Sequence, residues 1–375
     1  MINEEEKMKK WMTVVCLLIV AAFVFAACAP AAETASQVPE SSTESGEASA
    51  ESSTEASAGT ETTGSGKHAI VFKNTGNPYG EKEMEGFENA VKEAGQEAIL
   101  RAPDQPTAEG QIQIIEELIA QGVDSITVVA NDPDALQPAL TKAMQAGIKV
   151  IAVDSGVNAQ SRELFVNQAG SELIGQALMD AAYDMCSGSG EFAILSATSQ
   201  ATNQNAWIEA LQKIMESDEK YKDMELVKVA YGDDLRDKSV SETEALLQSY
   251  PDLKCIVAPT TVGIAAAGKV LTDKNLGGKV ALTGLGLPSE MAEYIDNGVC
   301  EYMFLWNPMD LGYLAGYTAM ALTDGTITGA TGDKFEAGTL GEYTVVDASD
   351  GGTEIILGPP FRFDSSNIAE WKDVY

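Results

Sequence analysis

Histidine is almost absent from this sequence, since His68 is the single histidine among 375 residues. A serine–histidine–aspartate triad needs a histidine beside its nucleophile, and catalytic zinc sites commonly use two or three histidines. His68 stands just before the first predicted strand, and we expect it on the surface. The sequence therefore excludes histidine-based hydrolysis and multi-histidine metal sites, and we expect no cofactor and no bound metal.

Basic residues are also scarce. The chain has 24 lysines and arginines against 57 aspartates and glutamates, for a formal net charge of −33. Such a surface repels phosphate backbones, so we expect no nucleic-acid partner. A sugar-responsive transcription regulator would need a basic helix-turn-helix ahead of its ligand-binding domain. The acidic N-terminal region of this chain excludes that class.

Cysteines are few in the part of the chain that is expected to fold. Cys186, Cys255 and Cys300 are odd in number and show no CxxC spacing. This pattern indicates neither a disulfide framework nor a zinc site. We expect the three side chains to be buried as small apolar groups.

The N-terminus carries an export signal. Lys9 and Lys10 precede an apolar run over 12–25, which is too short to span a bilayer. The small residues before Cys28 resemble a bacterial lipobox, which implies that this cysteine is lipidated and becomes the mature N-terminus. An ordinary signal peptide with an incidental Cys28 is the alternative. We expect residues 1–28 to be a lipoprotein signal peptide that leaves the protein anchored by lipid outside the cytoplasm.

Residues 29–66 consist almost entirely of alanine, serine, threonine, glycine and glutamate, without lysine or arginine. Such a segment cannot bury enough apolar surface to order itself. Repulsion between its glutamates favours an extended chain. We therefore predict a disordered acidic linker that holds the folded part away from the membrane.

Residues 67–375 alternate short apolar runs with longer amphipathic segments. The amphipathic pattern predicts helices such as 108–121 and 135–146. Apolar runs without polar alternation indicate strands buried on both faces, hence parallel sheets covered by helices. Two consecutive sets of such units predict an α/β fold with two doubly wound lobes. The predicted strands are 69–72, 97–100, 125–129, 149–153, 192–195, 226–230, 255–258, 280–285 and 302–305.

Polar residues gather where these predicted strands end, and ligands of such sheets lie beyond the carboxyl ends of the strands. Amides, hydroxyls, a lysine and a few carboxylates follow the strands, with Tyr79 and Trp207 nearby. Charge-assisted hydrogen bonds can hold hydroxyl groups, while aromatic faces suit C–H edges. The pattern therefore favours a small, hydroxyl-rich ligand such as a sugar.

Several segments of the folded part resemble the sugar-binding proteins of ATP-driven (ABC) importers, in the ribose-binding group of the type I periplasmic binding fold. Within that group the rhamnose-binding branch is the most similar. The resemblance spans 67–375 and implies two lobes joined by a three-segment hinge, about 67–169 with 307–343 and about 170–306 with 344–375. It rests on 107–111, 130–136, 201–205, 284–291 and 306–313.

The resemblance also implies a set of ligand-binding residues in the cleft. They are Lys73, Asn77, Tyr79, Asn131, Asp154, Ser155, Asn203, Gln204, Thr260, Thr261, Leu287 and Asn307. Among them Asp154 is the expected grip on sugar hydroxyls, with a helix N-cap as its alternative role. For Lys73 the alternative is a salt bridge between the lobes. Trp207 and Trp306 fit either an aromatic platform or hinge and core packing.

A neighbouring branch binds the furanosyl signal autoinducer-2, and Lys73, Asp154 and Gln204 fit its pattern. Asn203 stands where that branch has aspartate, and Thr261 where it has alanine. The ribose and galactose branches carry an aspartate where this chain has Gly286. The resemblance thus favours rhamnose, with autoinducer-2 as the alternative ligand.

An enzyme would need catalytic groups in the same cleft. Paired carboxylates such as Asp132 and Asp154 could in principle cleave a glycosidic bond, provided that they lie at matched spacing across the sugar. A binding site explains these residues without catalysis, so we expect no enzyme activity. The expected partners are a sugar, the permease subunits of an ABC transporter and the membrane, with the protein itself a monomer. Nothing in the sequence shows whether the protein also reports its ligand to a chemoreceptor or a sensor kinase.

Overall fold

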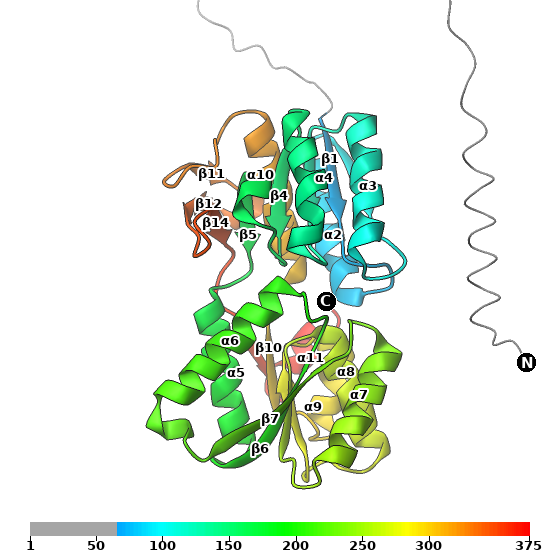
Figure 1. The fold of residues 1–375 in the computed structure, drawn as a ribbon, viewed down its shortest axis with the longest axis vertical. Coiled ribbons are helices and arrows are strands. Elements are labelled where there is room, and N and C mark those ends of the chain that lie inside the picture. The colour runs from blue at the N-terminus through cyan, green and yellow to red at the C-terminus, as the bar shows by residue number, and fades with distance from the viewer. Residues whose placement is uncertain (1–65) are drawn as a thin grey trace, which may run out of the picture. The chain divides into compact units, whose positions relative to one another are not determined.

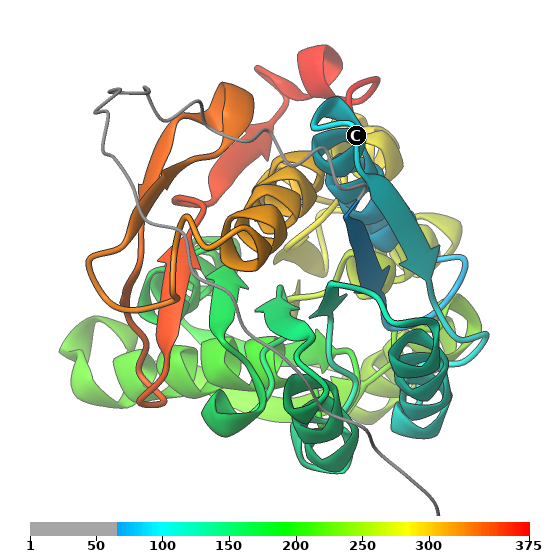
Figure 2. The same cartoon turned by 90° about the horizontal axis from the view of Figure 1, so that it is seen from above.

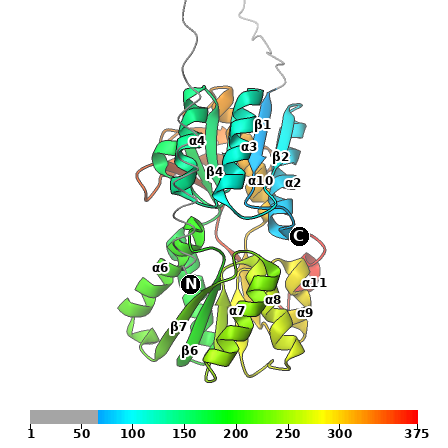
Figure 3. The ribbon, with the colours of Figure 1, turned by 45° about the vertical axis from the view of Figure 1, so that its right-hand side comes forward.

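The computed structural model describes residues 66–375. The predicted signal peptide, Cys28 and nearly all of the predicted linker lie outside the described residues. The folded part consists of two lobes, drawn one above the other in Figure 1 and again, turned about the vertical axis, in Figure 3. None of the helices between residues 66 and 375 has both the length and the apolar character needed to cross a membrane.

The first lobe is built on a seven-stranded sheet. Its order is β13-β14-β5-β4-β3-β1-β2, and all neighbours are parallel except β13 and β14. From β2 to β5 this is the doubly wound order, whose switch point lies between β1 and β3. The strands are β1 (Lys67–Val71), β2 (Glu97–Arg101), β3 (Ser125–Val128), β4 (Lys149–Val153), β5 (Leu164–Asn167), β13 (Val346–Asp347) and β14 (Thr353–Ile356).

Helices cover both faces of this sheet, as Figure 2 shows from above. Helices α2 and α10 pack against one face, and α3 and α4 against the other. Along β1, Ile70 belongs to the first apolar core and Val71 to the second. The helices are α2 (Pro78–Glu93), α3 (Ala108–Gln121), α4 (Pro133–Gln145) and α10 (Pro308–Thr323); a small hairpin, β11 (Lys334–Glu336) with β12 (Glu342–Thr344), completes the lobe.

The second lobe repeats the plan with the strand order β7-β6-β8-β9, and bridges from β9 lead on to β10. Strand β15 pairs with β10 in antiparallel fashion. The strands are β6 (Gly190–Ser196), β7 (Met224–Tyr231), β8 (Cys255–Ala258), β9 (Ala281–Gly284), β10 (Tyr302–Leu305) and β15 (Phe361–Asp364). The helices are α5 (Ser171–Met185), α6 (Thr202–Ser217), α7 (Arg236–Ser249), α8 (Thr261–Asp273), α9 (Pro288–Asp296) and α11 (Ile368–Trp371).

The predicted α/β class with two doubly wound lobes is confirmed, and each predicted strand overlaps an observed one. The chain crosses between lobes after β5 and after β10, where two hinge segments were predicted. The third crossing, predicted near 342–345, is wrong. Strand β14 pairs with β5 in the first sheet, so the chain returns to the second lobe only between Ile356 and Phe361.

His68 is not on the surface as expected but is fully buried. Its Nδ1 lies 2.7 Å from Ser125 Oγ, and its Nε2 lies 2.5 Å from Gln96 Oε1. Burial lowers the pKa of His68, which favours the neutral ring. The residue therefore helps to join β1 to its neighbouring strand. Cys186, Cys255 and Cys300 are free and buried, as predicted.

Candidate functional site

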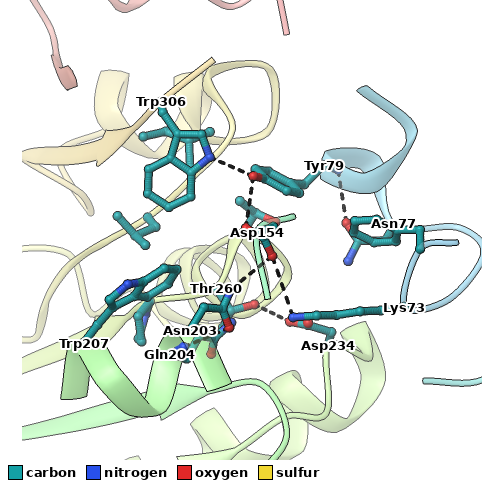
Figure 4. Close-up of a pocket in the computed structure, with 15 residues that line it drawn as sticks. Lys73, Asn77, Tyr79, Asp154, Asn203, Gln204, Trp207, Asp234, Thr260 and Trp306 are labelled. Atoms are coloured by element: carbon teal, nitrogen blue, oxygen red, sulfur yellow. Dashed lines mark hydrogen bonds and ion pairs between the residues drawn. The ribbon is translucent and has the colours of Figure 1, made fainter. Parts of the chain in front are cut away.

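A cavity lies between the lobes, where the strands of both sheets end (Figure 4). It has a volume of about 40 Å³ and is partly open to solvent. Its lining consists of Phe72, Lys73, Asn77, Tyr79, Asp154, Asn203, Gln204, Trp207, Asp234, Pro259, Thr260, Thr261, Leu285, Leu305 and Trp306.

Asp154 occupies the centre of the polar part of this cavity. It follows β4 in a left-handed backbone conformation, with φ of 56°. Aspartate tolerates that region better than most residues, and strained conformations are concentrated at functional sites. The backbone turn therefore aims the carboxylate into the cleft. No helix begins at this residue, so the alternative role as a helix cap is not observed.

Three side chains surround the Asp154 carboxylate. Tyr79 donates its hydroxyl to Oδ1 at 3.2 Å, and Asn203 donates its amide to Oδ2 at 3.0 Å. The ammonium of Lys73 lies 3.9 Å from Oδ2. Burial raises the pKa of Asp154 to about 6, although the positive Lys73 opposes that shift. The carboxyl is therefore mostly ionised at pH 7 and becomes neutral in mild acid.

Lys73 and Asp154 both belong to the first lobe, so their ion pair does not join the two lobes. The expected alternative role of Lys73, a salt bridge across the cleft, is not observed. Other contacts join the lobes instead. Ser155 donates its hydroxyl to Asn203 Oδ1 at 3.1 Å, and Thr202 donates to the carbonyl of Gly156 at 3.0 Å. Ser155 thus ties the lobes together outside the cavity lining.

Aromatic side chains form one wall of the cavity. Trp306, in the second hinge crossing, donates its indole N–H to the hydroxyl of Tyr79 at 2.7 Å. The ring centroids of Trp207 and Trp306 lie 5.7 Å apart, with the rings in an edge-to-face arrangement. Both tryptophans are buried and also line the cavity. Each therefore packs against the core and forms part of the cavity wall. The wall offers apolar surface beside the polar centre.

The second lobe supplies amide and hydroxyl groups. Gln204 Oε1 accepts hydrogen bonds from Ser196 Oγ and from the backbone N–H of Ala197, both at 2.7 Å. These contacts fix the side chain and leave its amide nitrogen for the cavity. Thr260 caps α8 and donates its hydroxyl to Asp234.

Most of the predicted site residues line the cavity, but four do not. Asn131 donates its amide to the carbonyls of Lys73 and Thr107, so it supports the loop that carries Lys73. Asn307 caps α10 through Met309 N, and Leu287 is buried where α9 begins. The polar groups of Asn131, Asn307 and Ser155, the fourth of these residues, are used within the fold, which strand-end position alone does not reveal.

Sequence reasoning missed Asp234, together with the apolar lining residues Phe72, Pro259, Leu285 and Leu305. Asp234 comes soon after the end of β7, where none of the predicted site residues lies. Asp233 and Asp234 both have positive φ values, 55° and 52°. Two consecutive acidic residues soon after a predicted strand were therefore a usable signal.

Asp154, Asn203 and Trp207 also line a wider groove of about 1020 Å³ between the lobes. Hinge residues Gly170 and Ser171 lie along it. A small molecule can therefore reach the Asp154 carboxylate from this side. Within residues 66–375, no group of three or more histidine, cysteine or acidic side chains is placed to hold a metal ion.

The architecture is that of a two-lobed α/β protein with a cavity in the cleft between the lobes. Residues 68–327 match the family model described as a periplasmic binding protein domain. An ABC transporter solute-binding protein from Clostridium phytofermentans, solved with bound L-rhamnose, is 53% identical. That match covers 83% of this chain and 99% of the other, with a TM-score of 0.82.

Two further proteins are more distant. A D-ribose/D-allose-binding protein of Pseudomonas aeruginosa is 26% identical over 60% of this chain and 72% of its own length. LsrB from Clostridium saccharobutylicum, in complex with AI-2, is 22% identical with a TM-score of 0.76. The match covers 81% of this chain and 99% of the other chain, and at this low identity it shows a shared fold alone. The chain belongs to the periplasmic binding protein family, whose members bind solutes and are not enzymes.

Proposed function

We propose that this protein captures a sugar, L-rhamnose, in the cleft between its lobes and delivers it to the permease of an ABC transporter. The observation that carries the proposal is the buried Asp154 carboxylate, set between Lys73, Tyr79 and Asn203. An ionised carboxylate can accept hydrogen bonds from two neighbouring hydroxyls, and each is stronger than a neutral pair. Gln204, Thr260 and Thr261 would meet the remaining hydroxyls from the second lobe.

Two features favour a deoxyhexose. The apolar side chains of Leu285, Leu305 and Trp306 line the cavity and would accommodate a methyl group. A Cβ added at Gly286 would lie 2.5 Å from the sulfur of Met303, so the lobe has no room there for an aspartate. The rhamnose-bound relative, at 53% identity, supports the same ligand.

Autoinducer-2 is the second candidate ligand. Lys73, Asp154 and Gln204, the residues that fit its binding pattern, all line the one cavity. Asn203 weighs against it, because its amide donates to Asp154 where that pattern has an aspartate. A second carboxylate at this position would face the first at close range, which is unfavourable unless one of them is protonated.

The lipid anchor remains part of the proposal, and so does an extracytoplasmic location. It is supported by the basic start, the short apolar run and the small residues before Cys28. Several acyl chains on one cysteine would hold the protein at a membrane, at about 0.8 kcal/mol per buried methylene. Replacing Cys28 with serine should release the protein from membranes, and continued membrane retention would defeat the assignment.

A thermal-shift panel tests the ligand. The purified protein would be heated with rhamnose, fucose, ribose, galactose, glucose or autoinducer-2. A ligand at a hundred times its dissociation constant adds roughly 2.7 kcal/mol to the free energy of unfolding. A clear shift with rhamnose supports the proposal, and a shift with autoinducer-2 alone would replace it with signal uptake. No shift with any of the six would contradict both.

A further inference from the structure

Glu83 is a buried acid that the proposed binding mode leaves without a role. It lies in α2, and its side chain is fully buried. Neither carboxyl oxygen has a hydrogen-bond partner among residues 66–375. An ionised carboxylate in such a place is very unfavourable, and buried polar groups without partners are rare. Its presence therefore needs a physical explanation.

The position of Glu83 on α2 links it to the ligand site. Tyr79 precedes it by four residues, which places the two side chains on the same face of the helix. Tyr79 donates its hydroxyl to Asp154 and receives a hydrogen bond from Trp306. Glu83 thus lies one helical turn from a residue that holds the central carboxylate.

The charged groups that act on Glu83 are Asp154 and Lys73. Helix α10 packs closely along α2, and a Cβ at its Gly312 would lie 1.8 Å from the carbonyl oxygen of Glu83. Nearby on α10, Asp310 interacts with Asn307, and Tyr313 donates to Glu93. Neither Asp310 nor Glu93 is among the charged groups that shift the pKa of Glu83.

Across the cleft, Asp234 adds negative charge near Asp154. Among the described residues, Lys73 and Arg162 are the buried cationic side chains, and Arg162 pairs with Asp350. Lys73 is thus the buried cation that acts on both Asp154 and Glu83. Its distance of 3.9 Å from Asp154 is longer than a hydrogen bond.

Burial raises the pKa of Glu83 well above its usual value, and the negative charge of Asp154 adds to this effect. Glu83 is therefore protonated under conditions in which exposed glutamates are ionised. In that state it leaves Lys73 to Asp154. Once ionised, it would compete with Asp154 for the same ammonium group.

We propose that Glu83 is a positioning residue of the ligand site: as a neutral acid it keeps Lys73 beside Asp154, and its ionisation draws Lys73 away and weakens sugar binding. This inference rests on the proposed sugar site. If it is right, the sugar affinity falls toward both low and high pH. The fall at low pH (the acid limb) comes from protonation of Asp154, and the fall at high pH (the alkaline limb) comes from ionisation of Glu83.

The test compares the wild-type protein with Glu83→Gln, which has nearly the same shape but cannot ionise. Calorimetric titration with L-rhamnose would give the dissociation constant from pH 5 to pH 9. We expect the wild type to bind most tightly between two limbs, and Glu83→Gln to keep the acid limb and lose the alkaline one. Glu81→Gln, an exposed change of the same kind on the same helix, is the matched control and should keep both limbs.

A second measurement does not depend on the sugar. A carboxyl whose folded pKa lies above its unfolded pKa reduces stability progressively as the pH rises through that interval. The melting temperature of Glu83→Gln should therefore exceed that of the wild type by a margin that grows from pH 5 to pH 8. A margin that stays constant with pH would contradict a buried neutral acid.

The outcomes separate the two levels of the account. An alkaline limb of equal size in the wild type and in Glu83→Gln would overturn the role of Glu83, while the sugar site would stand. A wild type without an alkaline limb would overturn it as well. Failure of the wild type to bind any sugar at any pH would overturn the proposed function, and the melting temperatures would still report on Glu83.

Discussion

The two lobes share one strand order but bring different chemistry to the cleft. The first lobe contributes ionised groups, Lys73 and Asp154, and holds Asp154 in a strained backbone conformation. The second contributes mainly amides and hydroxyls, through Asn203, Gln204 and Thr260. The same scaffold thus separates two tasks. One lobe carries the charged grip, and the other adds neutral hydrogen-bonding groups that complete the site.

The strongest way to break this comparison is Asp154→Asn, which removes the carboxylate that the first lobe brings to the cleft. Hydrogen bonds to a charged group contribute about 1.5–3 kcal/mol each, so losing two of them should weaken sugar binding at least about a hundredfold. The empty protein should melt at the same or a higher temperature at pH 7.5, because the raised pKa of Asp154 shows that burial disfavours its charge. Titration calorimetry and thermal melts check both. A large loss of apo stability would indicate a mainly structural residue.

Acid removes the same charge without a mutation. The pKa of Asp154 is raised to about 6 in the empty protein, and hydroxyl donors favour its ionised form. Binding should therefore weaken below pH 6, by roughly tenfold for each further pH unit. Affinity that stays constant from pH 7 to pH 5 would contradict the charged grip. In Asp154→Asn the residual affinity should not show this dependence.

Asn203→Ala tests the contribution of the second lobe. It removes the amide that donates to Asp154 and the oxygen that accepts from Ser155. We expect about a tenfold loss of affinity, since a typical hydrogen bond contributes about 0.5–1.5 kcal/mol. A double-mutant cycle with Asp154→Asn should show coupling between the two sites. Strictly additive effects would mean that the lobes act independently.

Trp306→Phe should have the smallest effect. It keeps an aromatic ring in the wall but removes the N–H that donates to Tyr79 at 2.7 Å. We expect a loss of about three- to tenfold in affinity, from one hydrogen bond to a residue that positions Asp154. Titration calorimetry measures it. A loss as large as that of Asp154→Asn would place the grip at the aromatic wall instead.

The central strands of both sheets could be predicted because they are buried on both faces and read as continuous apolar runs. Strands β13 and β14 could not, because most of their residues are exposed or half-buried and their sequences mix polar with apolar residues. Strand β5 was missed as well. The missed pairing of β14 with β5 is also why the third hinge crossing was placed too early. Local sequence contains little information on such long-range pairings.

The candidate site divides in the same way. Lys73, Asp154 and Gln204 could be placed because each follows a predicted strand, where ligand contacts are expected. The burial of His68 and Glu83 could not be foreseen. The partners of His68 come from other segments of the chain, and Glu83 lies in a run of charged residues typical of an exposed helix face. Burial of a polar side chain is decided by tertiary packing.

The most direct test of the account is a crystal structure of the protein with L-rhamnose. We predict one sugar in the cleft, with two hydroxyl oxygens about 2.5–2.7 Å from the Asp154 carboxylate, as expected for charge-assisted bonds. The amides of Asn203 and Gln204 should meet it from the second lobe. A sugar bound elsewhere, or one in the cleft that leaves Asp154 bonded only to Tyr79 and Asn203, would contradict the central claim.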